Sequence, residues 1–223
     1  METKDGYLSV IGTNFFPPLS IIYEKITELE SHNGNEVQIP VYENGYSVAG
    51  IVLSVLFLES YVSRINSILL SRNQIEKFTT GTRLIRSIFE NDNLANVVTE
   101  LYIVRDAIAH NHVWSADIIS NEQGLSFDNE PLLLNIYGDK KFKDVVDIDR
   151  RKTRILSLNV FPTNIGQEDA ISVLENVYEA LSFFESIDRN YCYISHCRIH
   201  FRNELMPFSD FIGIIRDIKR QSK

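Results

Sequence analysis

The sequence predicts a mainly α-helical fold, a bundle of helices that carries a small antiparallel β insertion. Several stretches place apolar residues at the three- and four-residue spacing of a helix that buries one face. Over residues 119–166 this period gives way to alternating apolar and polar residues with turn signals, which is typical of short antiparallel strands. The 223 residues contain no internal repeat and no linker that would divide two domains, so we expect one domain over residues 1–223.

The N-terminal part, residues 1–47, is expected to be an extension of the helical core. Residues 19–29 have the apolar spacing of a helix, and residues 37–42 have the pattern of a short strand or extended segment between two Asn-Gly turn signals. Residues 48–70 predict a long helix that is apolar nearly all round in its first two turns, which is typical of the centre of a bundle.

Two further helices complete the predicted core, residues 48–118. A shorter helix is expected between residues 73 and 89, with a break near residues 79–81. A longer helix is expected from residue 94 to about residue 114, capped by Asp92 or Asn93.

The C-terminal half is expected to consist of the β insertion, residues 119–166, followed by helices over residues 167–223. The insertion has alternating segments at residues 125–127, 132–137, 142–146 and 155–160, which predict three or four strands. A helix over residues 167–187, a strand or irregular helix over residues 191–201, and a final amphipathic helix capped by Ser209 follow.

Composition and charge exclude several classes of protein. The net charge of −8 rules out a broad basic surface that coats nucleic acid, so any contact with RNA has to be local. The longest apolar run, residues 51–58, is too short to cross a bilayer, and no signal peptide is visible. The chain has two cysteines, Cys192 and Cys197, which suit a reducing compartment. We expect a cytoplasmic protein without membrane contact.

The stretch from Arg105 to His112 is the strongest functional signal in the sequence. Arg105 lies on the apolar stripe of its helix, where its permanent charge cannot be removed by deprotonation. It therefore needs a partner or a function. One expectation is a structural ion pair with Glu59, which interrupts the apolar helix before it. The other is catalysis, because a forked cation for phosphate and a histidine that moves protons near neutral pH suffice to cleave RNA without metal.

Arg105, Asp106 and His110 resemble the Arg-x(4–6)-His motif of HEPN domains, in the form Arg, then Asn or Asp, three residues, then His. The motif lies late in a long helix that follows another long helix with Glu-Ser-Tyr at residues 59–61. The resemblance covers residues 48–114 and the helix that begins at residue 167. It implies an HEPN-like helical bundle that forms a homodimer, with the two motif helices facing each other across a composite cleft.

The same resemblance implies a metal-independent endoribonuclease in a toxin–antitoxin, abortive-infection or other defence system. Arg105 would bind and polarise the scissile phosphate of the RNA, and His110 would be the general acid or base. Asp106 would orient them or hold the helix partner. We expect no cofactor and no metal ion, and a cognate antitoxin or another partner protein is compatible with this function.

His112 is a second candidate for the catalytic imidazole. On an ideal helix His110 lies about 140° from Arg105, whereas His112 lies within about 20° of it. Three alternatives stay open: the helix ends or bends near Ala109, the two residues act from different sides of a dimer cleft, or His112 is the working residue. Asn111 is expected to line the cleft.

Clustered cations are the other places where an RNA backbone could be held. Such clusters are usually solvated faces, but they become a substrate track if they flank the motif. We assign Arg83 and Arg86, which precede the motif, to substrate binding. The remaining clusters are Lys140, Lys141 and Lys143; Arg150, Arg151, Lys152 and Arg154; and Arg216, Lys219, Arg220 and Lys223.

Two other functions fit parts of the sequence. The first is a non-catalytic helical module that binds protein or nucleic acid, in which Arg105 is a structural charge. The second is a metal site at Cys192, His196, Cys197 and His200. All four of those residues fall in one short segment, whereas structural zinc sites usually join two separated pairs, so we expect packing and surface roles for them instead.

Overall fold

The computed structural model describes residues 12–29, 41–110, 114–115, 117–121, 124–127, 132–133 and 140–221. This part of the chain is mainly helical with a few small antiparallel strands, which confirms the predicted fold class at that level. Buried residues from every described α-helix join one continuous hydrophobic cluster.

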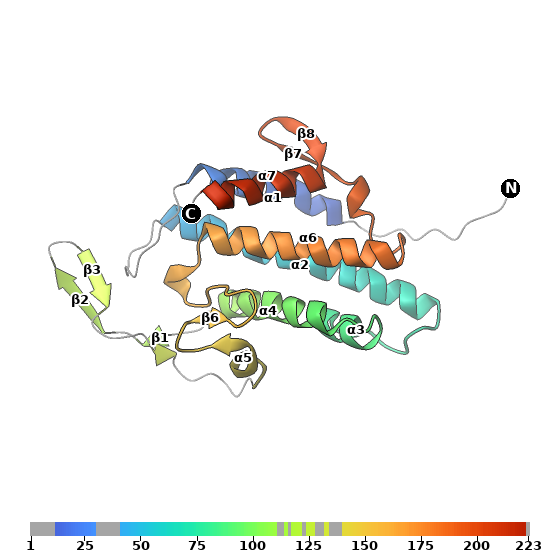
Figure 1. The fold of residues 1–223 in the computed structure, drawn as a ribbon, viewed down its shortest axis with the longest axis horizontal. Helices are drawn as coiled ribbons and strands as arrows, with labels where there is room; N and C mark the ends of the chain where they lie inside the picture. Colours follow the sequence, from blue (N-terminus) through green and yellow to red (C-terminus); the bar gives the residue numbers. More distant parts are fainter. Residues whose placement is uncertain are drawn as a thin grey trace.

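Figure 1 shows the helices in three layers. The middle layer holds the two longest, α2 (Val41–Ser71) and α6 (Gln167–Ile187), which lie side by side. The outer layers are α1 (Phe16–Glu28) with α7 (Phe208–Gln221) on one side, and α3 (Gly81–Ser87) with α4 (Asp92–Ala109) on the other. The core helix α2 therefore contacts α1, α4 and α6.

Helix α2 explains why the sequence has one strongly apolar stretch. Residues Asn44–Ser71 are long enough to cross a membrane, and an 18-residue stretch within them has a mean hydropathy of 1.6. Among them, Ile51, Val55, Leu58 and Ile65 are fully buried within the bundle. A central helix of a helical bundle meets the same length and hydropathy test, because it buries several faces at once.

The boundaries of the N-terminal helices differ from the prediction. Val41 and Tyr42 belong to α2 and not to a strand, so the Asn44-Gly45 pair lies inside the helix and not in a turn. Residues 73–80 are not helical. The Asn66 side chain in α2 accepts a hydrogen bond of 2.9 Å from the Thr79 amide and donates one of 3.0 Å to the Thr79 carbonyl. These two bonds hold the connection to α3 against α2.

Helix α4 begins and ends earlier than predicted. Its N-cap is Asn91, whose side chain accepts a hydrogen bond of 3.0 Å from the Leu94 amide, and not Asp92 or Asn93. It ends at Ala109, and Trp114 lies in the short strand β1 (Trp114–Ser115) instead of the helix. The Trp114 ring packs edge-on against Phe161, with ring centroids 5.1 Å apart, so it lies against the segment that precedes α6.

Among its described residues the β insertion is not one sheet, and residues 134–137 of the predicted strand 132–137 lie outside them. Its strands form separate two-stranded antiparallel ladders. Residues 142–145 of the segment 142–146, predicted as a strand, lie in a helix that buries Phe142, and Val146 begins a strand. The ladders are β1 with β4 (Leu132–Leu133), β2 (Ile118–Asn121) with β3 (Gly124–Phe127), and β5 (Val146–Asp147) with β6 (Lys152–Thr153); the helix is α5 (Lys140–Val145).

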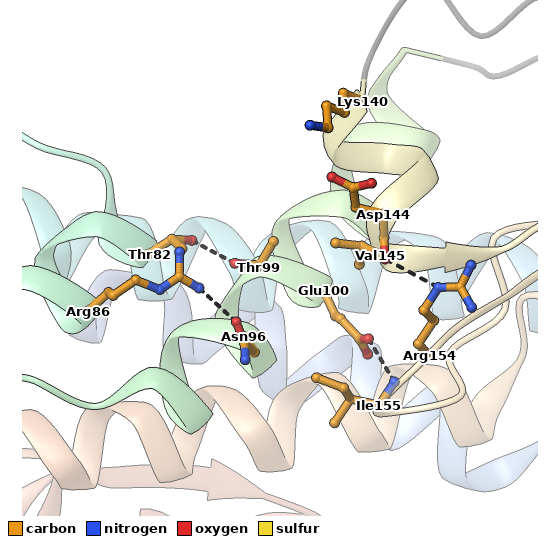
Figure 2. A pocket seen from close by; sticks show the side chains of 10 residues that line it. All are labelled: Thr82, Arg86, Asn96, Thr99, Glu100, Lys140, Asp144, Val145, Arg154 and Ile155. Atoms are coloured by element: carbon orange, nitrogen blue, oxygen red, sulfur yellow. Dashed lines mark hydrogen bonds between the residues drawn. The ribbon is translucent and has the colours of Figure 1, made fainter.

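Residues 155–160 were also predicted as a strand, and they form an irregular segment with an isolated bridge at Asn159. Buried Glu100 on α4 accepts hydrogen bonds from the backbone amides of Ile155 and Leu156, at 2.7 Å and 2.8 Å. Figure 2 shows the bond to Ile155. The carboxylate therefore accepts hydrogen bonds from backbone amides that a neighbouring strand would otherwise accept. It ties the insertion to the helical core.

Helix α6 begins and ends at the residues predicted. The Asp169 carboxylate accepts bonds from the Gly166 and Asn159 amides, at 3.0 Å and 2.9 Å, which pairs the N-cap amide and ties the preceding segment to the start of the helix. Burial of this carboxyl raises its pKa, although the bonds from Asn159 and Gly166 act in the opposite direction.

The C-terminal segment is an irregular turn, a hairpin and a helix. The short 3₁₀ helix η3 (Ile194–His196) precedes the hairpin of β7 (Arg198–Phe201) and β8 (Glu204–Pro207). Arg202 and Asn203 have positive φ values of 50° and 65°, as a two-residue hairpin turn requires. Helix α7 begins at Phe208, so Ser209 lies in its first turn and not at its cap position.

We predict that Glu100→Ala destabilises the protein by about 3 kcal/mol, because two partly buried backbone amides lose a charged acceptor. The measurement is the midpoint of urea unfolding. The control is Glu179→Ala, which removes a mostly exposed glutamate of α6 and should cost less than about 0.5 kcal/mol. Equal losses for the two variants would show that Glu100 does not anchor the insertion.

Candidate functional site

Arg105 lies between two carboxylates at the boundary between the core and solvent. One terminal nitrogen donates a hydrogen bond to the Glu59 carboxylate on α2, and the other lies 2.9 Å from Oδ1 of Asp106. The side chains of Arg105, Glu59 and Asp106 are 23%, 34% and 36% exposed. We call these three residues the Arg105 cluster; it confirms the predicted Glu59 partner and is reachable from solvent.

The Arg105 cluster has a formal charge of −1, since two carboxylates surround one guanidinium. Both terminal nitrogens of Arg105 are engaged, and its Nε is buried without a hydrogen-bond partner among the described residues. The cluster therefore holds the guanidinium in one orientation but leaves one of its donors unsatisfied, which has a cost in free energy. An anion could compete for its outer face only by displacing or sharing these carboxylates.

Tyr102 packs one helical turn before Arg105 and limits how α3 approaches α4. A Cβ atom at Gly81, the first residue of α3, would collide with the Tyr102 hydroxyl and come within 3.1 Å of Val62. Burial raises the pKa of Tyr102 above its ordinary value, and the nearby Glu59 charge raises it further, while Arg105 partly offsets both. The tyrosine stays protonated and forms part of the packed wall behind the Arg105 cluster.

His110 is the C-cap residue of α4, because the helix ends at Ala109. Its backbone amide donates to the Asp106 carbonyl at 2.9 Å, and its side chain is exposed. Of the three geometric alternatives, the structure has the helix ending at Ala109. Within the described part of the chain, the imidazole forms no hydrogen bond or ion pair. Asn111 and His112, which the sequence also nominates, lie outside the described residues.

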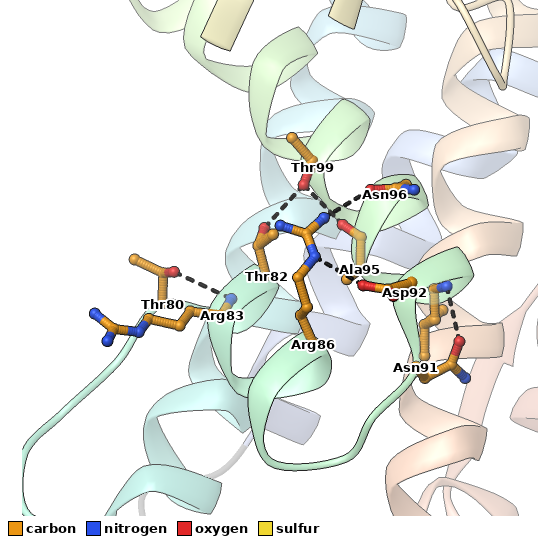
Figure 3. A network of polar contacts seen from close by, with 10 residues as sticks. Thr80, Thr82, Arg83, Arg86, Asn91, Asp92, Ala95, Asn96 and Thr99 are labelled. Carbon is orange, nitrogen blue, oxygen red and sulfur yellow. Dashed lines mark hydrogen bonds and ion pairs between the residues drawn. The ribbon is translucent and has the colours of Figure 1, made fainter.

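Arg83 and Arg86 lie on α3, away from the Arg105 cluster. Arg86 bonds Asp92 and Asn96 at the start of α4, at 3.0 Å and 2.7 Å, whereas the exposed Arg83 points away from that network (Figure 3). Asn96 and Arg105 are nine residues apart, which is about 180° on an ideal helix. One copy of the chain therefore does not bring these two arginines to Arg105.

Arg86 instead faces a cavity of about 690 Å³ on the other side of α4, between α3, α5 and the segment after β6 (Figure 2). Two cations of the insertion, Lys140 and Arg154, line the same cavity. In the sequence these three cations belong to separate clusters, so the sequence did not predict that they lie around one cavity. The sequence shows these cations, but their placement around one cavity depends on the position of α5 and on the hydrogen bonds of Glu100.

The cysteine and histidine residues near the C-terminus do not converge. Cys192 and Cys197 are buried, which raises the pKa of the Cys192 thiol to about 12 and that of Cys197 to about 11, whereas His196 and His200 are exposed. In the part of the chain that the structure describes, no three histidine, cysteine or acidic side chains gather as a metal site would require.

Comparison with known proteins finds no family model, no curated protein and no solved structure that matches this chain. The geometry around Arg105 and around the cavity therefore has to support any functional proposal by itself.

We predict that Arg105 and Glu59 are energetically coupled. In a double-mutant cycle with Glu59→Gln and Arg105→Met, the coupling in unfolding free energy should be about 1 kcal/mol, since both side chains are partly screened by water. The control is the exposed pair of Lys25 and Glu28, 2.8 Å apart, whose coupling should be clearly smaller because water screens both charges. A coupling no larger than the control would contradict the ion pair.

Proposed function

We propose that the protein is a metal-independent endoribonuclease of the HEPN type, with Arg105 as the phosphate-binding residue and His110 as the general acid or base. The observation that supports this most is the position of the Arg105 cluster, where a partly exposed guanidinium and an exposed histidine share one end of α4. A purely packing role would require no histidine at this helix end.

The two carboxylates favour catalysis by fixing the guanidinium. An arginine side chain loses much conformational freedom when it binds a phosphate, and Glu59 and Asp106 remove that freedom before the substrate arrives. Each terminal nitrogen of the guanidinium carries a second hydrogen, which it can donate to a phosphate oxygen that shares the site with these carboxylates. In this proposal Glu59 and Asp106 are positioning residues.

The proposed reaction is an internal transesterification. The His110 imidazole takes the proton of a ribose 2′-hydroxyl, and the 2′-oxygen attacks the adjacent phosphorus. Arg105 stabilises the added negative charge of the pentacoordinate phosphate. The bond from phosphorus to the 5′-oxygen breaks, and that oxygen takes a proton from a protonated imidazole. The products are a 2′,3′-cyclic phosphate and a 5′-hydroxyl end, without net consumption of protons or metal ions.

A homodimer supplies the second imidazole that this reaction uses. One α4 end offers one Arg105 and one His110, whereas two facing α4 ends offer an acid and a base around a single phosphate. The proposed biological setting is a toxin–antitoxin, abortive-infection or other defence system in the cytoplasm, where an antitoxin or another partner protein would restrain RNA cleavage.

The alternative function is a non-catalytic helical module that binds protein or nucleic acid. The ion pair between Arg105 and Glu59 favours it, because a paired, half-buried arginine already has a structural explanation. The two functions differ in what happens when His110 is removed, since the exposed imidazole contributes little to folding.

We predict that the purified protein cleaves RNA in EDTA and leaves 2′,3′-cyclic phosphate ends. Arg105→Ala and His110→Ala should each lower the cleavage rate about 100-fold or more, because each removes a group that acts on the phosphate or its proton. The assay follows end-labelled RNA on a denaturing gel, and His196→Ala, which removes another exposed histidine, serves as the control.

Undiminished cleavage by Arg105→Ala or His110→Ala, or cleavage abolished by EDTA, would reject the proposed mechanism. No cleavage by the wild-type protein, together with normal folding of His110→Ala, would favour the binding module.

A further inference from the structure

The cavity between α3, α4, α5 and the segment after β6 has the dimensions of a small-molecule site. Its volume is about 690 Å³, within the range of about 300–1,000 Å³ that is usual for such sites. It lies on the face of α4 opposite Arg105, so it is separate from the proposed ribonuclease site. Its lining residues are Thr82, Arg86, Asn96, Thr99, Glu100, Lys140, Asp144, Val145, Arg154 and Ile155.

Three cations from separate parts of the chain face this cavity. Arg86 is already engaged with Asp92 and Asn96. Arg154 uses only its Nε, which donates to the Asp144 carbonyl at 3.2 Å, and Lys140 has no hydrogen-bond partner among the described residues. The Lys140 ammonium and the terminal nitrogens of Arg154 are therefore the donors available to an anion. In a chain with a net charge of −8, three cations among the lining residues of one cavity point to a negatively charged ligand.

The walls of the cavity are fixed before any ligand binds. Glu100 bonds the backbone amides of Ile155 and Leu156, which holds the segment that carries Arg154 against α4. These bonds also use both oxygens of the Glu100 carboxylate. On the opposite wall the Thr82 and Thr99 hydroxyls lie 3.2 Å apart. A site built in this way loses little conformational entropy on binding.

The remaining lining groups suit hydroxyl groups of a ligand better than a second phosphate. Asp144 lies four residues after Lys140 and thus on the same face of α5, where Figure 2 shows both side chains above the cavity. Its carboxylate repels a bare phosphate but accepts hydrogen bonds from hydroxyls. Asn96 has its oxygen bonded to Arg86, so its amide nitrogen is left as a donor.

The apolar wall is formed by Val145 and Ile155. Ile155 is 56% exposed, so apolar surface at the edge of the cavity is available to a ligand. The carbon skeleton of an organic ligand would cover this surface, whereas inorganic phosphate is too small to do so.

We propose that this cavity binds a sugar phosphate, either free or as the sugar-phosphate part of a mononucleotide. The phosphate is held by Lys140 and Arg154, the sugar hydroxyls by Asp144 and Asn96, and the carbon skeleton rests on Ile155. The site does not depend on the ribonuclease activity, because Arg105 lies on the other face of α4.

The test is calorimetric titration at about 0.15 M salt, where exposed charges are largely screened. The probes are ribose 5-phosphate, AMP, ribose and inorganic phosphate. Ribose 5-phosphate or AMP should bind about tenfold or more tightly than either ribose or phosphate, because only the joined compounds fill both halves of the site. Tighter binding of AMP identifies a mononucleotide as the source, and equal binding identifies the free sugar phosphate. Equal binding of inorganic phosphate and ribose 5-phosphate would overturn the proposal.

Variants assign the two halves of the site. Lys140→Gln and Arg154→Gln should each weaken binding of ribose 5-phosphate about tenfold, while Arg189→Gln, an exposed arginine outside this cavity, should leave it unchanged. Asp144→Asn should weaken ribose 5-phosphate about fivefold but strengthen inorganic phosphate, because it removes a hydroxyl acceptor and a repelling charge together. Strengthening of both probes would overturn the role of Asp144.

Arg105→Ala separates this proposal from the ribonuclease. That variant should bind ribose 5-phosphate as the wild type does, even where it no longer cleaves RNA. If Arg105→Ala lost the binding while Lys140→Gln kept it, the anion would be bound at the Arg105 cluster, and the cavity proposal would be wrong. Circular dichroism of each variant confirms that the fold is retained.

Discussion

The charge of Arg105 constrains how α4 packs in this protein. An arginine cannot lose its proton at any ordinary pH, so its place on an otherwise apolar helix face requires a carboxylate from the facing helix. Glu59 supplies it from α2, and Asp106 adds a second from the next residue of α4. The pairing fixes the register of α4 against the central helix, and the close approach of Gly81 to Tyr102 fixes how α3 packs on α4. The position of His110 follows, because α4 ends one turn later.

Helix α4 then has two faces with different chemistry. The face with Arg105 meets α2 and ends at solvent beside His110, and we assign it to RNA cleavage. The face with Asn96 and Glu100 meets α3 and the insertion, and we assign it to a small phosphorylated ligand. The insertion is thus part of the packed fold, since hydrogen bonds from its backbone to Glu100 hold it against the helical core. An acidic chain can concentrate cations in such places without a basic surface overall.

Long apolar periods predicted the helices well, and the end residues of α6 agree with the prediction because Asp169 caps a clear amphipathic stretch. The permanent charge of Arg105 on an apolar helix face also allowed its Glu59 partner to be predicted from the sequence. Short segments were less predictable: residues 142–146 fit a strand and a helix equally by pattern, and tertiary packing of Phe142 decided for the helix. The cavity could not be predicted, because it depends on side-chain bonds between Glu100 and a distant backbone.

The proposed function requires that Arg105 contacts the scissile phosphate while His110 lies beside the ribose 2′-hydroxyl. The most direct measurement is a crystal structure of the protein with an RNA strand that carries a single 2′-deoxy nucleotide at the cleavage site, which blocks the reaction. The account predicts two facing α4 ends, Arg105 hydrogen-bonded to oxygens of that phosphate, and a His110 imidazole beside C2′. RNA bound elsewhere, with Arg105 paired only to Glu59 and Asp106, would contradict it.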